Sequence, residues 1–146
     1  MSLDMSTAVA QRVAASFARQ GMMQHLGARL VSVKLGMVEL SLPFSERVKQ
    51  QQGGYHGGAM GALADVAAGY AGLTVAPPDS EVTTVEYKIN FLAAFQGGDL
   101  RAIGKVVRAG KRIIVTTAEV SHHAPDGQVR DCALMQQTLA PVPKTY

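Results

Sequence analysis

The chain has 146 residues, of which 47% are hydrophobic and 17% charged, and this balance predicts one folded domain over residues 1–146. The net charge is only +3, the basic residues are scattered, and there is no Trp, so a nucleic-acid surface with stacking aromatic side chains is not expected. A single cysteine, Cys132, excludes an intrachain disulfide and a cysteine zinc cluster. The presence of one unpaired cysteine favours a reducing compartment and predicts a cytoplasmic location.

Residues 1–27 predict an N-terminal helical segment. Its apolar residues recur every fourth position, as in an amphipathic helix: Met5, Val9, Val13 and Phe17. Ser6 or Thr7 would cap this helix and Gly21 would end it. Arginines in place of a continuous apolar core argue against a secretory signal, and an organelle presequence is the alternative that this composition leaves open.

The stretch from Gly57 to Ala76 carries one charge in 20 residues, which on length alone would allow a membrane span. Seven of these residues are Ala and five are Gly, which are only weakly apolar. Asp65, near the centre, would cost about 2.5 to 3.5 kcal/mol in a bilayer. We therefore expect a buried helix, ended by Pro77 and Pro78, and no membrane partner.

Short strand patterns lie on both sides of this helix. Residues 30–44 predict a hairpin around Gly36, and from Ser80 onward apolar and polar residues alternate. Alternation would place Thr83, Val85, Tyr87, Ile89 and Phe91 on one side of a strand, and Thr84, Glu86, Lys88 and Asn90 on the other. Turns at 96–99, 109–111 and 124–127 would join further strands over 100–108, 112–121 and 128–139 as adjacent hairpins.

This order of elements predicts an α+β fold in which a curved antiparallel sheet wraps around one long helix, with a short N-terminal helix added. The central helix would be buried nearly all round, because its uniform apolarity leaves no solvated face. One face and one edge of such a sheet remain to be covered, so we expect an oligomer.

Asp65 is the only charged side chain between His56 and Asp79, and it lies two turns inside the predicted helix. A buried carboxylate is costly unless it is hydrogen-bonded or opens onto water. Two interpretations follow: a satisfied core acid, or a general base or nucleophile tuned by apolar surroundings.

The segment His56-Gly57-Gly58 enters the same helix, where free backbone amides could bind an oxyanion or polarise a carbonyl. Turn geometry and close packing are the alternative roles of the glycines. Gly57 and Asp65 are roughly 12 Å apart along one helix at 1.5 Å per residue. If both act on one carbon, Asp65 must therefore come from a neighbouring subunit.

Other chemistry finds little support in the sequence. His122 and His123 would point to opposite faces of a strand, so no metal site is expected. Cys132 lies among apolar residues and is interpreted as a core residue. A phosphate-binding surface, or alternatively a solvated turn, is predicted from clustered cations at one hairpin: Lys105, Arg108, Lys111 and Arg112.

The run from His56 to Asp65, H-G-G-A-M-G-A-L-A-D, is followed by Gly69-Tyr70-Ala71, by residues 84–92 (T-V-E-Y-K-I-N-F-L) and by the Gly110-Lys111 hairpin. Over roughly residues 30–139 this pattern resembles the hot-dog fold acyl-CoA thioesterases of the phenylacetate-pathway (PaaI-like) group. The resemblance implies homodimers, usually paired into homotetramers, with shared active sites. It implies a hydrolase that cleaves a medium-chain or aromatic acyl-CoA without a metal or other cofactor, coenzyme A being part of the substrate.

The resemblance also implies roles for individual residues. The Gly57 amide would polarise the thioester carbonyl with His56 beside it, and Asp65 of the partner would be general base or nucleophile. Thr84 stands where the family often has a Ser or Thr that orients water or the carboxylate. Gln50 stands where many members have Asn, and Gln51 or Gln52 could substitute for it. Apart from the resemblance, Gly58 at the helix entrance and the clustered hairpin cations Arg108, Lys111 and Arg112 are predicted to contact substrate or coenzyme A.

Two alternatives remain at this point. A hot-dog acyl thioester dehydratase would share the fold, but it usually pairs His with Asp or Glu in other sequence contexts. A non-catalytic acyl-CoA binding protein would be expected to lack the acid, which is present as Asp65.

Overall fold

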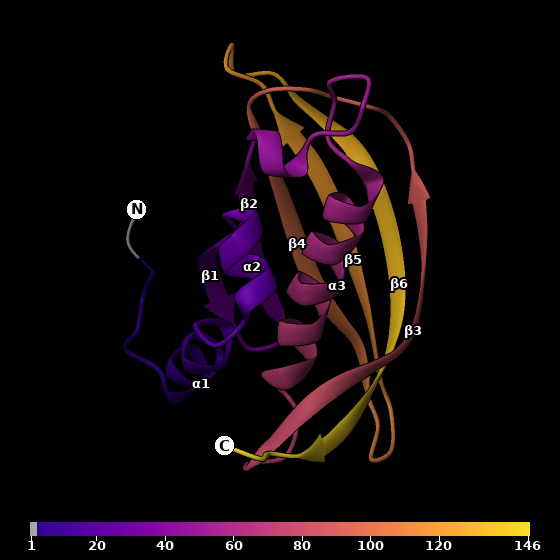
Figure 1. Ribbon diagram of the computed structural model, residues 1–146. Helices are drawn as coiled ribbons and strands as arrows, with labels where there is room; N and C mark the ends of the chain where they lie inside the picture. Colours follow the sequence, from indigo (N-terminus) through magenta and orange to yellow (C-terminus); the bar gives the residue numbers. More distant parts are fainter. Residues whose placement is uncertain (1–2) are drawn as a thin grey trace.

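A six-stranded antiparallel sheet curves around one long helix in the computed structural model, which describes residues 3–146 (Figure 1). The first two residues of the predicted N-terminal segment lie outside the described part. The helices are α1 (Ala8–Phe17), α2 (Gly21–Leu26), the 3-10 helix η1 (Glu46–Val48) and α3 (Gly57–Leu73). The strands are β1 (Arg29–Lys34), β2 (Met37–Pro43), β3 (Ser80–Phe91), β4 (Asp99–Ala109), β5 (Ile114–His123) and β6 (Val129–Pro143).

The strands lie in the order β1-β2-β4-β5-β6-β3, and each neighbouring pair is antiparallel. Helix α3 packs on the inner side of the curve against β2 to β6. This arrangement confirms the predicted α+β hot-dog fold.

One predicted connection is wrong. Alternation and the turn at 96–99 suggested that β3 and β4 form a hairpin, but β3 pairs with β6 and β4 pairs with β2 and β5. Residues 92–98 instead cross over the end of the sheet that holds the start of α3. There the Tyr55 N–H donates to the Phe95 carbonyl at 2.8 Å. As a result β3 is an edge strand, next to β6 on one side only.

Small residues allow α3 to lie very close to the sheet. A Cβ on Gly104 of β4 would stand only 2.3 Å from the Ala67 carbonyl oxygen of α3, so only glycine fits there. The helix ends at Leu73, with Thr74 as its C-cap, four residues before the prolines that were predicted to end it.

Helix α3 is not buried all round. Most of its side chains are buried, but one stripe at helical spacing is only partly covered in the single chain: Gly58, Ala62, Asp65, Val66 and Gly69. Asp65 therefore lies on the one side of the helix that the sheet leaves open.

A β-bulge in β3 corrects the predicted alternation. The β3–β6 register shifts between Thr84 and Glu86, so one extra residue, Val85, is accommodated. Thr84 consequently faces α3, on the same side as Tyr87 and Phe91, rather than the outer face with Glu86. The bulge thus turns the Thr84 hydroxyl toward Asp65.

The N-terminal helix is confirmed, with differences at both ends. Thr7 caps it by accepting a hydrogen bond from the Ala10 N–H at 3.1 Å, as predicted, whereas Met5 lies outside it and is exposed. Gly21 begins α2 instead of ending the segment. Across residues 3–146, no helix combines the length and the apolar character needed to cross a membrane.

Candidate active site

Asp65 is the centre of a small polar network on the open side of α3. Its Oδ1 accepts a hydrogen bond from the Thr84 hydroxyl of β3 at 2.7 Å and a second from the Gln137 amide of β6. Gln137 in turn accepts a hydrogen bond from the Thr116 hydroxyl of β5 at 2.9 Å. The carboxylate is thus held by side chains from three elements that are far apart in the sequence.

The two donors share one carboxylate oxygen. Both bonds reach Oδ1, and Oδ2 accepts none from the described residues 3–146. Oδ2 is also not a buried unpartnered atom, because the only such atom found in that range is Nε of Arg101. The second oxygen is therefore partly exposed, so water can reach it.

Burial raises the pKa of Asp65 above its ordinary value, and the hydrogen bonds from Thr84 and Gln137 act in the opposite direction. A carboxylate with a raised pKa is a stronger base, and these donors favour its ionised form. The arrangement combines the two properties that a general base needs.

The sequence analysis missed two residues of this network, Thr116 and Gln137. Gln137 is fully buried, in a stretch of β6 whose inward-facing neighbours are Met135 and Leu139. The available signal was a polar side chain at an inward position of an otherwise apolar strand, since such a group needs a buried partner. The uninterrupted alternation predicted for β3 placed Thr84 on the side of Glu86, so its approach to Asp65 did not follow from the strand pattern.

His56 is the N-cap of α3. Its Nδ1 accepts a hydrogen bond from the Gly58 N–H at 2.8 Å, so the ring proton is on Nε2. The Gly58 amide is therefore occupied, whereas the Gly57 N–H donates to no acceptor found within residues 3–146. The first free amide of the helix is thus that of Gly57, at the positive end of the helix dipole.

The loop before α3 places Gln50 beside a pocket of about 210 Å³. This pocket is lined by Gln50, Gln52, Gly54, Ala94, Phe95 and Gln96. The Gln50 side-chain oxygen accepts a hydrogen bond from the Gln52 N–H, and its Nε2 lies next to Gly54. Of the three glutamines considered, Gln50 and Gln52 line this pocket and Gln51 does not.

The hairpin cations lie far from Gly57 in the same chain. Lys105, Arg108, Lys111 and Arg112 are exposed, and the ion pairs found in residues 3–146 include none of them. Arg108, Lys111 and Arg112 lie at or beyond the end of β4 opposite to its start beside Tyr55, whereas Lys105 lies midway along the strand. Gly104 contacts Ala67, which is ten residues along α3 from Gly57, and Arg108 is four strand residues further, so Arg108 is roughly 28 Å from Gly57.

Cys132 is fully buried, and burial raises the pKa of its thiol to about 11, which confirms it as a core residue. Between residues 3 and 146, no three His, Cys, Asp or Glu side chains gather closely enough to hold a metal ion.

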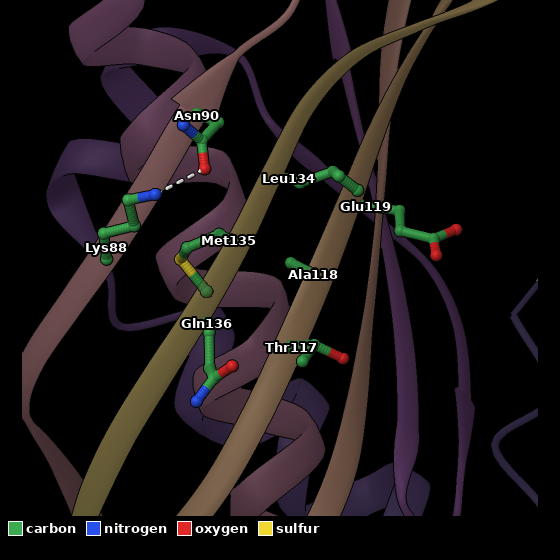
Figure 2. A pocket seen from close by; sticks show the side chains of 8 residues that line it. All are labelled: Lys88, Asn90, Thr117, Ala118, Glu119, Leu134, Met135 and Gln136. Atoms are coloured by element: carbon green, nitrogen blue, oxygen red, sulfur yellow. Dashed lines mark hydrogen bonds between the residues drawn. The ribbon is translucent and has the colours of Figure 1, made fainter.

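A pocket of about 370 Å³ lies away from this site, on the outer face of the sheet. Figure 2 shows the side chains that line it, among them Lys88 and Asn90 of β3, which are hydrogen-bonded at 2.7 Å, and Gln136 of β6. In that view the strands pass in front of α3, so the sheet separates this pocket from Asp65.

Comparison with known proteins agrees with this geometry. The family model described as "Thioesterase superfamily" matches residues 52–126, which include Asp65 and the entrance of α3. The chain belongs to the thioesterase superfamily. A putative esterase of Saccharolobus solfataricus is 32% identical over 104 residues, which are 71% of this chain and 72% of that one. A 1,4-dihydroxy-2-naphthoyl-CoA hydrolase of Listeria monocytogenes is 33% identical over 91 residues, which cover 62% and 74% of the two chains.

Solved structures extend the similarity over nearly the whole chain. A thioesterase family protein from Silicibacter pomeroyi superposes with a TM-score of 0.90 and 37% identity, covering 93% of this chain and 99% of that one. The E. coli PaaI protein of the phenylacetic acid degradation operon superposes with a TM-score of 0.82 at 22% identity, covering 94% and 95%, and shares the fold. These matches confirm the predicted resemblance to PaaI-like hot-dog thioesterases.

Proposed function

We propose that the protein hydrolyses acyl-CoA thioesters to a free acid and coenzyme A, with Asp65 as the catalytic carboxylate. The observation that carries the proposal is the Asp65 carboxylate itself: one oxygen is fixed by two donors and the other is partly exposed. Family membership and the naphthoyl-CoA hydrolase relative support a thioester of coenzyme A as the substrate. The acyl group is expected to be medium-chain or aromatic, and no metal or redox cofactor is needed.

Asp65 can act on a thioester by two routes, and in both of them the thioester carbonyl must lie next to the carboxylate. In the general-base route, Asp65 takes a proton from water, the hydroxyl oxygen attacks the thioester carbonyl and the C–S bond breaks. The coenzyme A thiolate leaves and is then protonated. The Gly57 N–H would donate to the carbonyl oxygen as negative charge develops on it. In the nucleophilic route, the carboxylate attacks the thioester carbonyl first, and the C–S bond breaks with loss of the coenzyme A thiolate to give a mixed anhydride. Water then hydrolyses this anhydride to the free acid and the regenerated Asp65 carboxylate.

The site would be shared between two copies of the chain, because Gly57 and Asp65 of one helix are roughly 12 Å apart. Edge strand β3 supports such pairing, since its outer backbone groups have no partner strand in the sheet. Large apolar side chains are also exposed along and just after it: Val85, Tyr87, Phe91 and Leu92. A second copy that covers this edge and the open stripe of α3 would bring its own Gly57 toward Asp65. We therefore propose a homodimer, or a homotetramer built from two such dimers.

The remaining predicted residues take supporting roles in this proposal. Gln50 would donate its amide to the acyl group or the attacking water, and the His56 Nε2–H would face the substrate. Thr84 would fix the carboxylate.

Thiol release from a panel of acyl-CoA substrates tests this proposal. The wild-type protein should hydrolyse at least one medium-chain or aromatic member. Asp65→Asn should reduce kcat at least ~100-fold, the scale expected for loss of a general base. The fold should survive, because the Asn oxygen can still accept from Thr84 and Gln137. A wild-type-like rate in a folded Asp65→Asn protein would reject the assignment, and circular dichroism melting shows whether the variant is folded.

A further inference from the structure

The side-chain amide of Gln137 links the Thr116 hydroxyl to the Asp65 carboxylate. Its Oε1 accepts from Thr116, and its Nε2 donates to Asp65 Oδ1, with the Thr84 hydroxyl 3.4 Å and the Asp65 carbonyl 3.3 Å from the same nitrogen. Gln137 and Thr116 are both fully buried. Both ends of the amide are therefore occupied, and the side chain has no solvent to turn toward.

The chemistry of the partners fixes which end of the amide faces Asp65. An ionised carboxylate only accepts hydrogen bonds, so the NH₂ group must point toward it. The Thr116 hydroxyl can donate, so it matches the carbonyl end of the amide. Thr116 thus holds Gln137 in the orientation in which it donates to the carboxylate.

We infer that Gln137 is a positioning residue for Asp65: anchored by Thr116, it holds the Oδ1 edge of the carboxylate and so presents Oδ2 to the reaction. This inference rests on the proposed role of Asp65. The terminal torsion of an aspartate is broad and roughly two-fold, so its carboxylate needs such external donors to keep one oxygen forward. Thr84 alone is a weaker restraint, because it lies exposed on edge strand β3.

Within residues 3–146, no charged side chain forms a hydrogen bond or ion pair with the Asp65 carboxylate. The elements packed against α3 around Asp65 turn uncharged residues toward it. On β2 and β4 these are Val38, Leu40, Leu42, Leu100, Ala102 and Gly104, and on β5 and β6 they are Ile114, Thr116, Ala118, Met135, Gln137 and Leu139. On β3, Tyr87 approaches Gly61, about one turn from Asp65. Gln137 and Thr84 are therefore the groups that stabilise the charge of Asp65.

The pH dependence of activity separates positioning from simple packing. Gln137→Leu keeps a buried side chain of similar size but removes the donor, so the ionised form of Asp65 loses stabilisation and the pKa of its carboxyl rises. Because the base must be ionised, the rising limb of kcat/KM should move upward by about one pH unit, a tenfold loss on that limb. The rate should recover largely at higher pH, and KM should change little.

Three further variants complete the experiment. Gln136→Leu changes the neighbouring glutamine, which lies on the outer face (Figure 2), and should leave the profile unchanged. Thr116→Val removes the anchor and should shift the limb in the same direction by a smaller amount, whereas Thr116→Ser keeps a hydroxyl and should restore the wild-type profile. If Gln137→Leu does not fold, the two Thr116 variants still decide the matter.

Two results would overturn the inference: an unchanged profile in folded Gln137→Leu and Thr116→Val, or a loss that is equal at every pH. Asp65→Asn measured in parallel separates this failure from a failure of the proposed function. If Asp65→Asn is inactive while the Gln137→Leu profile does not move, only the positioning role is wrong. If Asp65→Asn is fully active, the function proposed for the site is wrong as well.

Discussion

The two sides of α3 are built from the same small residues but are used differently. On the side that faces β4 and β6, the backbones and side chains are in direct contact: an added Cβ on Gly104 would stand 2.3 Å from the Ala67 oxygen, and one on Gly72 would stand 2.3 Å from Leu139. On the other side, Gly58, Ala62 and Asp65 belong to a stripe that the sheet covers only in part, with Thr84 of β3 and Gln137 of β6 reaching one oxygen of Asp65.

This difference shows that a glycine- and alanine-rich helix can serve close packing on one side and access on the other. The covered side allows no additional atom, because a well-packed core has no space for it. The open side has the single charged side chain of the helix, Asp65, and, at the start of α3, a free amide. Substitutions on the two sides should therefore affect different properties.

The largest expected effect is on stability, from Gly104→Ala on the covered side. Its Cβ would overlap the backbone of α3 at Ala67 and Ala68, which cannot move without displacing the helix. We expect the free energy of unfolding to fall by about 3 kcal/mol, as for severe overpacking. Chemical denaturation monitored by circular dichroism measures this loss.

Gly21→Ala is the matched control, because no atom lies within 4 Å of an added Cβ there. Its stability should stay within about 0.5 kcal/mol of wild type or rise slightly. Equal stability of Gly104→Ala and Gly21→Ala would show that α3 and β4 are not in the close contact described above.

Gly57→Ala at the helix entrance should reduce kcat about tenfold with little change in stability. The N–H remains, but a Cβ would stand 3.3 Å from the Phe91 ring and would hinder the approach of a carbonyl oxygen to the amide. The loss should be smaller than the 10²- to 10³-fold effect of removing an oxyanion donor altogether. Steady-state thiol release and thermal melting of the same sample provide both values.

Mixing Gly57→Ala chains with Asp65→Asn chains tests whether the site is shared. In a mixed dimer one site combines an intact Gly57 with an intact Asp65, and random pairing would restore roughly a quarter of wild-type activity. A mixture that shows only the average of the two parent activities would indicate that each site lies within one chain.

Much of the fold could be predicted from sequence, because local patterns determine it. The uniform apolarity of residues 57–73, the alternation on β2 and the turns at 109–111 and 124–127 each report a single element. The place of β3 at the edge could not be predicted, since strand order depends on pairing between distant segments. The bulge at Val85 was also invisible, because the residues around it alternate in the sequence without interruption.

In the candidate site, too, residues with a local signal could be predicted and those that depend on distant contacts could not. Asp65 stood out as the only charge in an apolar helix, and the segment His56-Gly57-Gly58 was recognised as the entrance of that helix. Gln137 is 72 residues from Asp65, and its role depends on the inward faces of β5 and β6 meeting α3 at one point. A three-dimensional contact of this kind leaves only a weak trace in the sequence, here a buried amide among apolar neighbours.

The smallest expected effect is on KM, from replacing the cations of the β4–β5 hairpin. The proposed site that uses the Asp65 of a chain lies nearer to the hairpin of the same chain than Gly57 does, because Asp65 is eight residues further along α3 toward that end. If Arg108 and Lys111 bind the phosphates of coenzyme A, replacing either with Gln should raise KM about threefold and leave kcat unchanged. The increase should shrink at high salt, since exposed charges are screened. A decrease in kcat at constant KM, or an unchanged KM at low salt, would restrict the substrate contacts to the α3 side of the site.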